Sequence, residues 1–289
     1  MGRAKRRDLV RWHDRRVTRE HVLIGATELA QRLKAGEQPT ILDVRWQLAA
    51  PDGRAAYERG HIPGAVYVSL EGELSDHSVA GQGRHPLPSG RDVEAAARRW
   101  GLRTGTPVVV YDDWNRAGSA RAWWVLTAAG IADVRILDGG LAAWTAAGGA
   151  LQTGVVTPEP GDVTVAHDDL YAGARRTLTA AQAAGVPLLD ARAPERFRGD
   201  VEPVDPVAGH IPGARNVPST SLLADDGTFL PDADLIRLAG DDAVGAYCGS
   251  GVTAAVVVAA LAAAGRDLAL YPGSWSQWCC DPTRPVERG

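Results

Sequence analysis

A cysteine followed by a loop of small residues stands near the end of this chain. Cys248 follows the apolar run that ends at Tyr247, and Gly249, Ser250 and Gly251 come directly after it. Glycines adopt backbone angles that other residues resist, so such a loop can turn N–H groups toward one atom and form an anion-binding nest. A helix starting behind the loop would add the positive end of its dipole. Both effects stabilise a thiolate, and Cys248 is therefore the candidate nucleophile.

Two other interpretations of this cysteine compete with that one. A lone cysteine among apolar residues is more often a small core residue, but a core cysteine needs no glycine-rich loop between a strand and a helix. Cysteine-based phosphatases use a similar loop, with an arginine six positions after the cysteine to clamp the phosphoryl group. That position is Ala254 here, so a phosphate dianion would lack its bidentate partner and phosphatase chemistry is disfavoured.

The stretch Cys248-Gly-Ser-Gly-Val-Thr253 resembles the active loop of 3-mercaptopyruvate sulfurtransferases, within the rhodanese family. Rhodaneses proper, which use thiosulfate, usually carry an arginine and a lysine where this chain has Gly249 and Ser250. The resemblance implies a sulfurtransferase that forms a persulfide on its cysteine. It also implies a substrate site lined by loop residues, namely Gly249, Gly251, Val252 and Thr253.

The elements around the loop are those of one α/β unit repeated in tandem. Four landmarks of the first half return in the same order in the second half, which chance rarely produces. Alternating strands and helices then predict two tandem α/β domains, each a mostly parallel sheet with helices on both faces. This layout resembles that of the tandem rhodanese family, so the resemblance implies two rhodanese-like domains. The matched landmarks are 41–45 with 188–192, 60–65 with 209–214, 110–112 with 246–248, and 138–144 with 272–278.

The repeat and the composition set the expected boundaries. We expect a basic N-terminal extension over 1–20, a non-catalytic domain over 21–148, a linker over 149–166 and a catalytic domain over 167–289. For the extension, a flexible tail is favoured over an arm that touches a polyanion. In parallel sheets, ligands bind beyond the carboxyl ends of the strands, which is where the cysteine loop would lie.

The first copy lacks the nucleophile. Asp112 occupies the cysteine position there, and a carboxylate cannot usefully attack sulfur and would repel an anionic donor. We therefore expect the first domain to contribute one wall of a cleft between the domains. The His-Ile-Pro-Gly-Ala stretches of both copies set a turn, so His61 and His210 are interpreted as structural.

The resemblance also suggests which residues support the cysteine. Arg196 takes the place of the family's arginine that pairs with the substrate carboxylate, but the second arginine, nine positions on, is Asp205 here. Arg198 is a candidate to substitute for it, and a solvated surface charge is the alternative for both arginines. Ser250 would donate a hydrogen bond to the substrate carbonyl.

In the mercaptopyruvate enzymes, that serine is thought to work with a histidine and an acid of the first domain. His85 lies at the matching place, and Glu71 lies where the family has an aspartate. A surface-loop histidine is the alternative for His85. Such a Ser–His–acid arrangement requires contact distances that no sequence shows.

Composition limits the remaining possibilities. The net charge of −4 gives no support for a nucleic-acid partner, and no apolar run reaches the length of a membrane span. Besides Cys248 the chain has only Cys279 and Cys280, too few for a disulfide framework, which favours a cytoplasmic location. We expect no metal or organic cofactor, a small-molecule sulfur donor, and a thiol, thioredoxin or cyanide as acceptor. The rival functions are thiosulfate:cyanide sulfurtransferase and a sulfur-carrier or redox-sensing protein without turnover.

Overall fold

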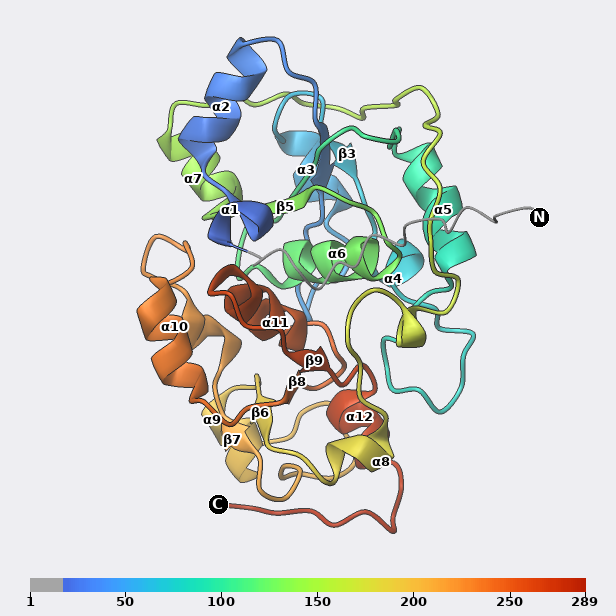
Figure 1. Cartoon of the computed structure of the whole chain (residues 1–289), viewed down its shortest axis with the longest axis vertical. Helices are drawn as coiled ribbons and strands as arrows, with labels where there is room; N and C mark the ends of the chain where they lie inside the picture. Colours follow the sequence, from blue (N-terminus) through green and yellow to red (C-terminus); the bar gives the residue numbers. More distant parts are fainter. Residues whose placement is uncertain (1–17) are drawn as a thin grey trace, which may run out of the picture.

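The computed structural model describes residues 18–289, and these form two parallel sheets (Figure 1). In the first sheet, the strand order is β1-β5-β4-β2-β3, and every neighbouring pair runs parallel. The longer strands are β-branched and buried, as strands covered on both faces must be. The strands are β1 (Leu23–Ile24), β2 (Thr40–Asp43), β3 (Val66–Tyr67), β4 (Val108–Tyr111) and β5 (Val134–Leu137).

Helices cover both faces of the first sheet. Ile41 and Val109 point to the face where α2 and α7 pack, and Leu42 and Val110 point to the face of α5 and α6. This division follows from the alternation of side chains along a strand. The helices are α1 (Arg19–Val22), α2 (Ala26–Lys34), α3 (Arg54–Arg59), α4 (Leu70–Glu73), α5 (Gly90–Arg99), α6 (Ala117–Ala128) and α7 (Gly140–Ala146).

The second sheet has the order β7-β6-β8-β9 and is also entirely parallel. Helices α8 and α12 cover one face, and α10 and α11 cover the other. Its strands are β6 (Leu188–Asp190), β7 (Arg215–Asn216), β8 (Gly245–Tyr247) and β9 (Ala269–Leu270). Its helices are η2 (Leu170–Ala172), α8 (Ala180–Ala183), α9 (Pro194–Arg198), η3 (Ser219–Leu222), α10 (Asp232–Ala239), α11 (Ala254–Ala263) and α12 (Ser274–Trp278).

The two units repeat each other down to single contacts. Asp43 lies opposite Tyr111 between β2 and β4, and Asp190 lies opposite Tyr247 between β6 and β8. The repeated histidines are structural in both copies. His61 stacks on the ring of Tyr57 and His210 on that of Phe197, each with Nδ1 at hydrogen-bond distance from a backbone carbonyl. The prediction of two tandem α/β units is thus confirmed.

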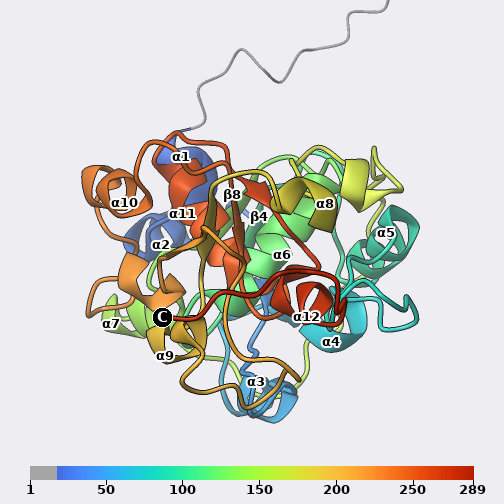
Figure 2. The same cartoon turned by 90° about the horizontal axis from the view of Figure 1, so that it is seen from below.

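The two units share one continuous apolar core. Helices α6 and α11 lie side by side at its centre (Figures 1 and 2). All ten residues of α11 are buried. A helix that is apolar all round must be surrounded by protein, and here α6 supplies the side that its own sheet does not cover. The loop that begins at Cys248 precedes α11, so this packing fixes the loop relative to the first unit.

Near the N-terminus the structure extends the folded region beyond the expected boundary. Arg19 and Glu20, placed in the flexible extension by the sequence prediction, belong to α1. Arg19 forms ion pairs with Asp138 of the first unit and Asp232 of the second. The rest of the predicted extension, residues 1–17, lies outside the described residues. None of the helices within 18–289 is long and apolar enough to cross a lipid bilayer.

Candidate active site

Cys248 directly follows β8 and opens the loop that leads into α11. Its side chain is almost fully buried, with 2% of the residue exposed. The backbone carbonyls of Cys248 and Gly249 accept hydrogen bonds from Trp275 and Ser276 at the start of α12. The Cys248 N–H donates to the Ser274 hydroxyl at 3.1 Å. Because α12 takes up these carbonyls, the loop can present N–H groups on the opposite side.

Gly251 supplies the N–H that reaches the sulfur. Its backbone nitrogen lies 3.1 Å from Cys248 Sγ. This residue has φ +80°, and a Cβ there would come within 2.5 Å of the Pro272 carbonyl oxygen, so only glycine fits. Several converging N–H groups were predicted, but within the described part of the chain only that of Gly251 has hydrogen-bond geometry with Sγ.

A chain of polar side chains runs from the loop into the first unit. Ser250 Oγ lies 2.7 Å from His85 Nδ1, and His85 Nε2 lies 3.0 Å from Glu71 Oε1. Ser250 and His85 are each 5% exposed. The Trp46 indole N–H donates to Glu71 Oε1 at 2.6 Å, and His77 Nε2 lies 3.0 Å from Glu71 Oε2. The structure therefore brings together the serine, histidine and acid selected from the sequence.

The charge states of this chain follow from its surroundings. Burial lowers the pKa of His85, and the carboxylate of Glu71 offsets only part of that effect. Burial raises the pKa of Glu71, but hydrogen bonds from Trp46 and His85 outweigh it and hold that pKa below its usual value. At neutral pH, His85 is neutral and Glu71 is ionised. A carboxylate only accepts hydrogen bonds, so the His85 proton is on Nε2, and Nδ1 accepts from the Ser250 hydroxyl.

Arg121 of α6 holds this arrangement across the domain interface. Its guanidinium is fully buried and donates to the His85 and Leu74 carbonyls at 3.0 Å and to the Gly251 carbonyl at 3.4 Å. Burial lowers the pKa of Arg121 to about 10. One side chain of the first unit thus contacts both the histidine segment and the cysteine loop.

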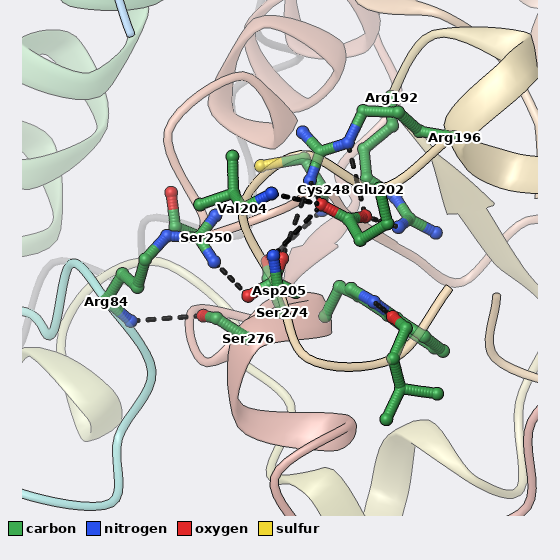
Figure 3. Close-up of polar contacts among 12 residues, drawn as sticks. Arg84, Arg192, Arg196, Glu202, Val204, Asp205, Cys248, Ser250, Ser274 and Ser276 are labelled. Atoms are coloured by element: carbon green, nitrogen blue, oxygen red, sulfur yellow. Dashed lines mark hydrogen bonds and ion pairs between the residues drawn. The ribbon is translucent and has the colours of Figure 1, made fainter. Parts of the chain in front are cut away.

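Arg196 points toward the cysteine loop from α9. Its Nη2 donates to Glu202 Oε1 at 2.6 Å and to Asp205 Oδ2 at 3.4 Å. A methyl group built on Gly249 would lie 3.5 Å from Arg196 Nη1. The guanidinium is therefore oriented by carboxylates on one side and faces the loop on the other, and it is not a solvated surface charge (Figure 3).

Arg84 reaches the same place from the first unit. Its Nη1 donates to Asp205, and a methyl group on Gly249 would lie 3.0 Å from its Nη2. The Arg84 backbone N–H donates to the Ser276 hydroxyl at 3.0 Å, which anchors the segment to α12. Burial raises the pKa of Asp205, while Arg84 counteracts that rise. Asp205, at the position of the missing second arginine, is thus the counterion of an arginine from elsewhere in the chain.

The remaining predicted site residues have other contacts. Arg198 is about half exposed and pairs with Asp200 at 2.8 Å, so its hydrogen bonds do not run to the cysteine loop. Val252 is buried among core residues, and Thr253 is the N-cap of α11. Within residues 18–289 no group of three or more His, Cys, Asp or Glu side chains is arranged to hold a metal ion.

The equivalent loop of the first unit is filled by its own carboxylate. Asp112 Oδ1 accepts from the Trp114 and Arg116 N–H groups at 3.1 and 3.2 Å, and Oδ2 accepts from the Ser119 N–H and hydroxyl at 3.0 and 2.6 Å. The Arg116 guanidinium pairs with the same carboxylate. Asp112 therefore occupies the position where an anion would bind, in keeping with a non-catalytic unit.

Sequence reasoning missed Arg84, Arg121 and Glu202. Arg84 stands next to the selected His85, which was its only local signal. Arg121 lies within an otherwise apolar helical stretch, and a charged residue in such a stretch is a signal of a buried charge with polar partners. Glu202 carries no local mark of its role. All three gain their contacts through tertiary structure rather than through a neighbouring motif.

Comparison with known proteins agrees with this fold. A family model described as Rhodanese-like domain matches the chain twice, over residues 25–147 and 174–280. The chain therefore belongs to the rhodanese family and carries two copies of its domain.

Several relatives match nearly the whole chain. A Mycobacterium tuberculosis protein named "Putative thiosulfate sulfurtransferase SseB" is 68% identical, covering 94% of this chain and 98% of its own. A Pseudomonas aeruginosa protein named "Probable 3-mercaptopyruvate sulfurtransferase" is 47% identical over 92% and 98%. The crystal structure of Escherichia coli SseA, whose title concerns 3-mercaptopyruvate sulfotransferases, superposes with a TM-score of 0.74 at 33% identity, covering 88% of this chain and 98% of that one.

Proposed function

We propose that this protein is a sulfurtransferase that moves a sulfane sulfur from 3-mercaptopyruvate to a thiol or cyanide acceptor through a persulfide on Cys248. The observation that carries the proposal is the hydrogen-bonded chain Ser250–His85–Glu71, which ends in the cysteine loop. A chain of this kind moves protons, and mercaptopyruvate is a donor whose reaction requires a proton to move.

In the first half-reaction, the Cys248 thiolate attacks the donor sulfur. A new S–S bond forms while the bond between sulfur and C3 of the donor breaks. The electron pair of that broken bond goes to C3 and gives the enolate of pyruvate. The donor enters as a thiol and loses one proton, and the pyruvate that leaves gains one proton at C3 to form its methyl group. The half-reaction therefore takes up and releases no net proton. The sulfur left on Cys248 is at the sulfane level.

Ser250 and His85 are placed to carry that proton. The single Ser250 proton is directed at His85 Nδ1, so the hydroxyl oxygen is free to accept the donor's thiol proton as its own passes to the imidazole. Glu71 stabilises the imidazolium that results, and the reverse transfer delivers a proton to C3. This relay differs from the role expected from the sequence, in which Ser250 polarises the substrate carbonyl.

The second half-reaction returns the cysteine to its thiolate. A thiol, thioredoxin or cyanide attacks the outer sulfur, and the electron pair of the broken S–S bond returns to Cys248 Sγ. The burial of Cys248 supports this ping-pong cycle because it shields the persulfide from water. We propose a cytoplasmic location, with no nucleic acid or membrane as partner.

Thiosulfate is the second candidate donor. The name of the mycobacterial relative favours it, as do two guanidinium groups close to Gly249. Against it, the loop itself carries no cationic side chain, and the two arginines are matched by Glu202 and Asp205. Thiosulfate is a dianion that expels sulfite and brings no proton, so it would leave the Ser250–His85 chain unused.

The test is a side-by-side measurement of kcat/KM for the two donors with one acceptor. We expect 3-mercaptopyruvate to exceed thiosulfate by at least about tenfold, which is about 1.4 kcal/mol in transition-state binding. A preference for thiosulfate would reject mercaptopyruvate as the donor. A protein that takes up one sulfur by mass and then stops would instead be a sulfur carrier.

A further inference from the structure

Two guanidinium groups from different domains converge on the open side of Gly249. A methyl group on this glycine would lie 3.0 Å from Arg84 Nη2 and 3.5 Å from Arg196 Nη1. Arg84 comes from the loop between α4 and α5 of the first unit, and Arg196 comes from α9 of the second. The absence of a side chain at position 249 leaves the space that the two groups face.

Carboxylates hold both groups from behind. Asp205 accepts from Arg84 Nη1 and from Arg196 Nη2, and Glu202 accepts from Arg196 Nη2 and Nε. Both carboxylate side chains are 3% exposed. The ion pairs therefore fix the orientation of the guanidinium planes instead of neutralising a mobile surface charge.

The donors that face Gly249 are still available. Among residues 18–289, neither Arg84 Nη2 nor Arg196 Nη1 has a hydrogen-bond acceptor. The Arg84 Nε is buried and also lacks a partner in this part of the chain. A buried arginine N–H that lacks an acceptor among the described residues, such as Arg84 Nε, is costly. Together with the two Nη groups that are unpaired within 18–289 and face the cysteine loop, it points to an anionic ligand at this place.

We propose that Arg84 and Arg196 together form the receptor for the donor's carboxylate, with Asp205 as the residue that positions Arg84. The proposal extends the proposed function by assigning the second carboxylate-binding arginine, which the chain lacks at position 205, to the first domain. The receptor accounts for the aspartate at that position, because an arginine there would repel Arg84. The charges of the two arginines are balanced by Glu202 and Asp205. The receptor therefore offers directed hydrogen bonds to the carboxylate of the donor but no excess positive charge that would favour a dianion.

A pair of alkylating agents tests the receptor without using sulfur transfer. Iodoacetate and iodoacetamide differ in a carboxylate against a neutral amide, and both react with a thiolate. The ratio of their rates at Cys248, followed by mass spectrometry of the Cys248 peptide, reports carboxylate capture beside the sulfur. The full-length wild type is compared with Arg84→Ala, Arg84→Lys, Arg196→Ala and, as the control, Arg91→Ala. Arg91 is a highly exposed arginine of the same domain.

We expect the iodoacetate-to-iodoacetamide ratio to fall about tenfold in Arg84→Ala and in Arg196→Ala, which is the effect of losing a charge-assisted hydrogen bond. Arg84→Lys should retain part of the ratio, and Arg91→Ala all of it. A ratio unchanged in both Arg84 variants would overturn the receptor, even if mercaptopyruvate turnover is intact. A wild type that fails to use mercaptopyruvate but shows the Arg84-dependent ratio would reject the proposed donor and leave the receptor standing.

Discussion

In the proposed proton relay, the protonation states of His85 and Glu71 are set by burial and by one or two neighbours. His85 is kept neutral by burial and oriented by Glu71, while Glu71 is kept ionised by Trp46 and His85. His85 is thus a proton acceptor and Glu71 a fixed anion, and Ser250 lies at the end of this hydrogen-bonded series. Burial also raises the pKa of Cys279 to about 12, so that thiol stays protonated at neutral pH.

The relay predicts an acid limb in the pH profile that depends on the donor. Protonation of His85 removes the acceptor at Nδ1, so kcat/KM for mercaptopyruvate should fall about tenfold per unit below the His85 pKa. Since burial lowers that pKa, the midpoint should lie below the ordinary histidine value of about 6.5. Thiosulfate brings no proton, and its profile should lack this limb. Identical acid limbs for both donors would contradict the relay.

Cys248 alone should carry the transferred sulfur. Cys248→Ser should abolish turnover with either donor, because serine at neutral pH offers no comparable nucleophile. The double variant Cys279→Ser, Cys280→Ser should keep most of the activity, since Cys279 stays protonated and Cys280 is exposed, away from the loop hydrogen bonds. The measurement is steady-state turnover together with the mass of the donor-treated protein. Sulfur retained by Cys248→Ser would refute the mechanism.

At the scale of elements, the cysteine loop connects β8 to α11 and is hydrogen-bonded to α12. Its carbonyls bond to the start of α12, and its last residues begin α11. Side chains at 249 and 250 therefore sit on a fixed backbone and can change specificity without refolding the loop. Position 249 has a further constraint, because a Cβ there would lie 3.0 Å from Arg84 Nη2 and a larger side chain would enter the space that the two arginines face.

Replacing Gly249 with arginine and Ser250 with lysine should shift the donor preference. The new cations would favour the dianion thiosulfate, and the loss of the Ser250 hydroxyl would break the link to His85. The arginine at 249 must also displace the Arg84 guanidinium. We expect the ratio of kcat/KM for mercaptopyruvate over thiosulfate to fall by about tenfold or more, or to invert. The single variant Ser250→Ala is the control, and it should lower mercaptopyruvate turnover without raising that with thiosulfate.

The elements were predictable from the sequence to different degrees. The buried strands at Thr40–Asp43, Val108–Tyr111 and Val134–Leu137 are short apolar runs rich in β-branched residues, which is the pattern that predicts a buried strand. The internal repeat showed which stretches of the first unit correspond to which stretches of the second. Arg84 and Arg121 could not be assigned in this way, because their partners are 121 and 130 positions away and depend on how the two units pack.

At the scale of the molecule, the candidate active site is made by both units together. Cys248, the proposed nucleophile, belongs to the second unit, whereas His85, Glu71 and Arg84 belong to the first. The shared apolar core around α6 and α11 holds the two units together, and Arg19 adds ion pairs to both units at one edge. An apolar interface alone tolerates small slips, so a directional contact at the site itself is needed to set the register.

Arg121 is one of these directional contacts, beside Ser250–His85 and Arg84–Ser276, and it supplies the last prediction. Arg121→Met would leave the carbonyls of Leu74, His85 and Gly251 without this donor, while Arg175→Met removes another arginine that packs on α6 but bonds to Thr127. Each variant should lower the free energy of unfolding, by about 1–3 kcal/mol. Only Arg121→Met should also lower kcat/KM for mercaptopyruvate, by about tenfold or more, because His85 loses its fixed distance from the loop.

Alkylation of Cys248 by neutral iodoacetamide separates positioning from general damage in these variants. It requires the cysteine loop but not the Ser250–His85 contact, so a slower rate in Arg121→Met than in Arg175→Met measures disturbance of the loop, which Arg121 contacts through Gly251. Turnover of mercaptopyruvate by Arg121→Met should fall further than this alkylation rate. Urea unfolding gives the two stabilities on the same samples. If both variants lose turnover equally, the shared core and the other polar contacts between the domains set the register, and Arg121 contributes only to stability.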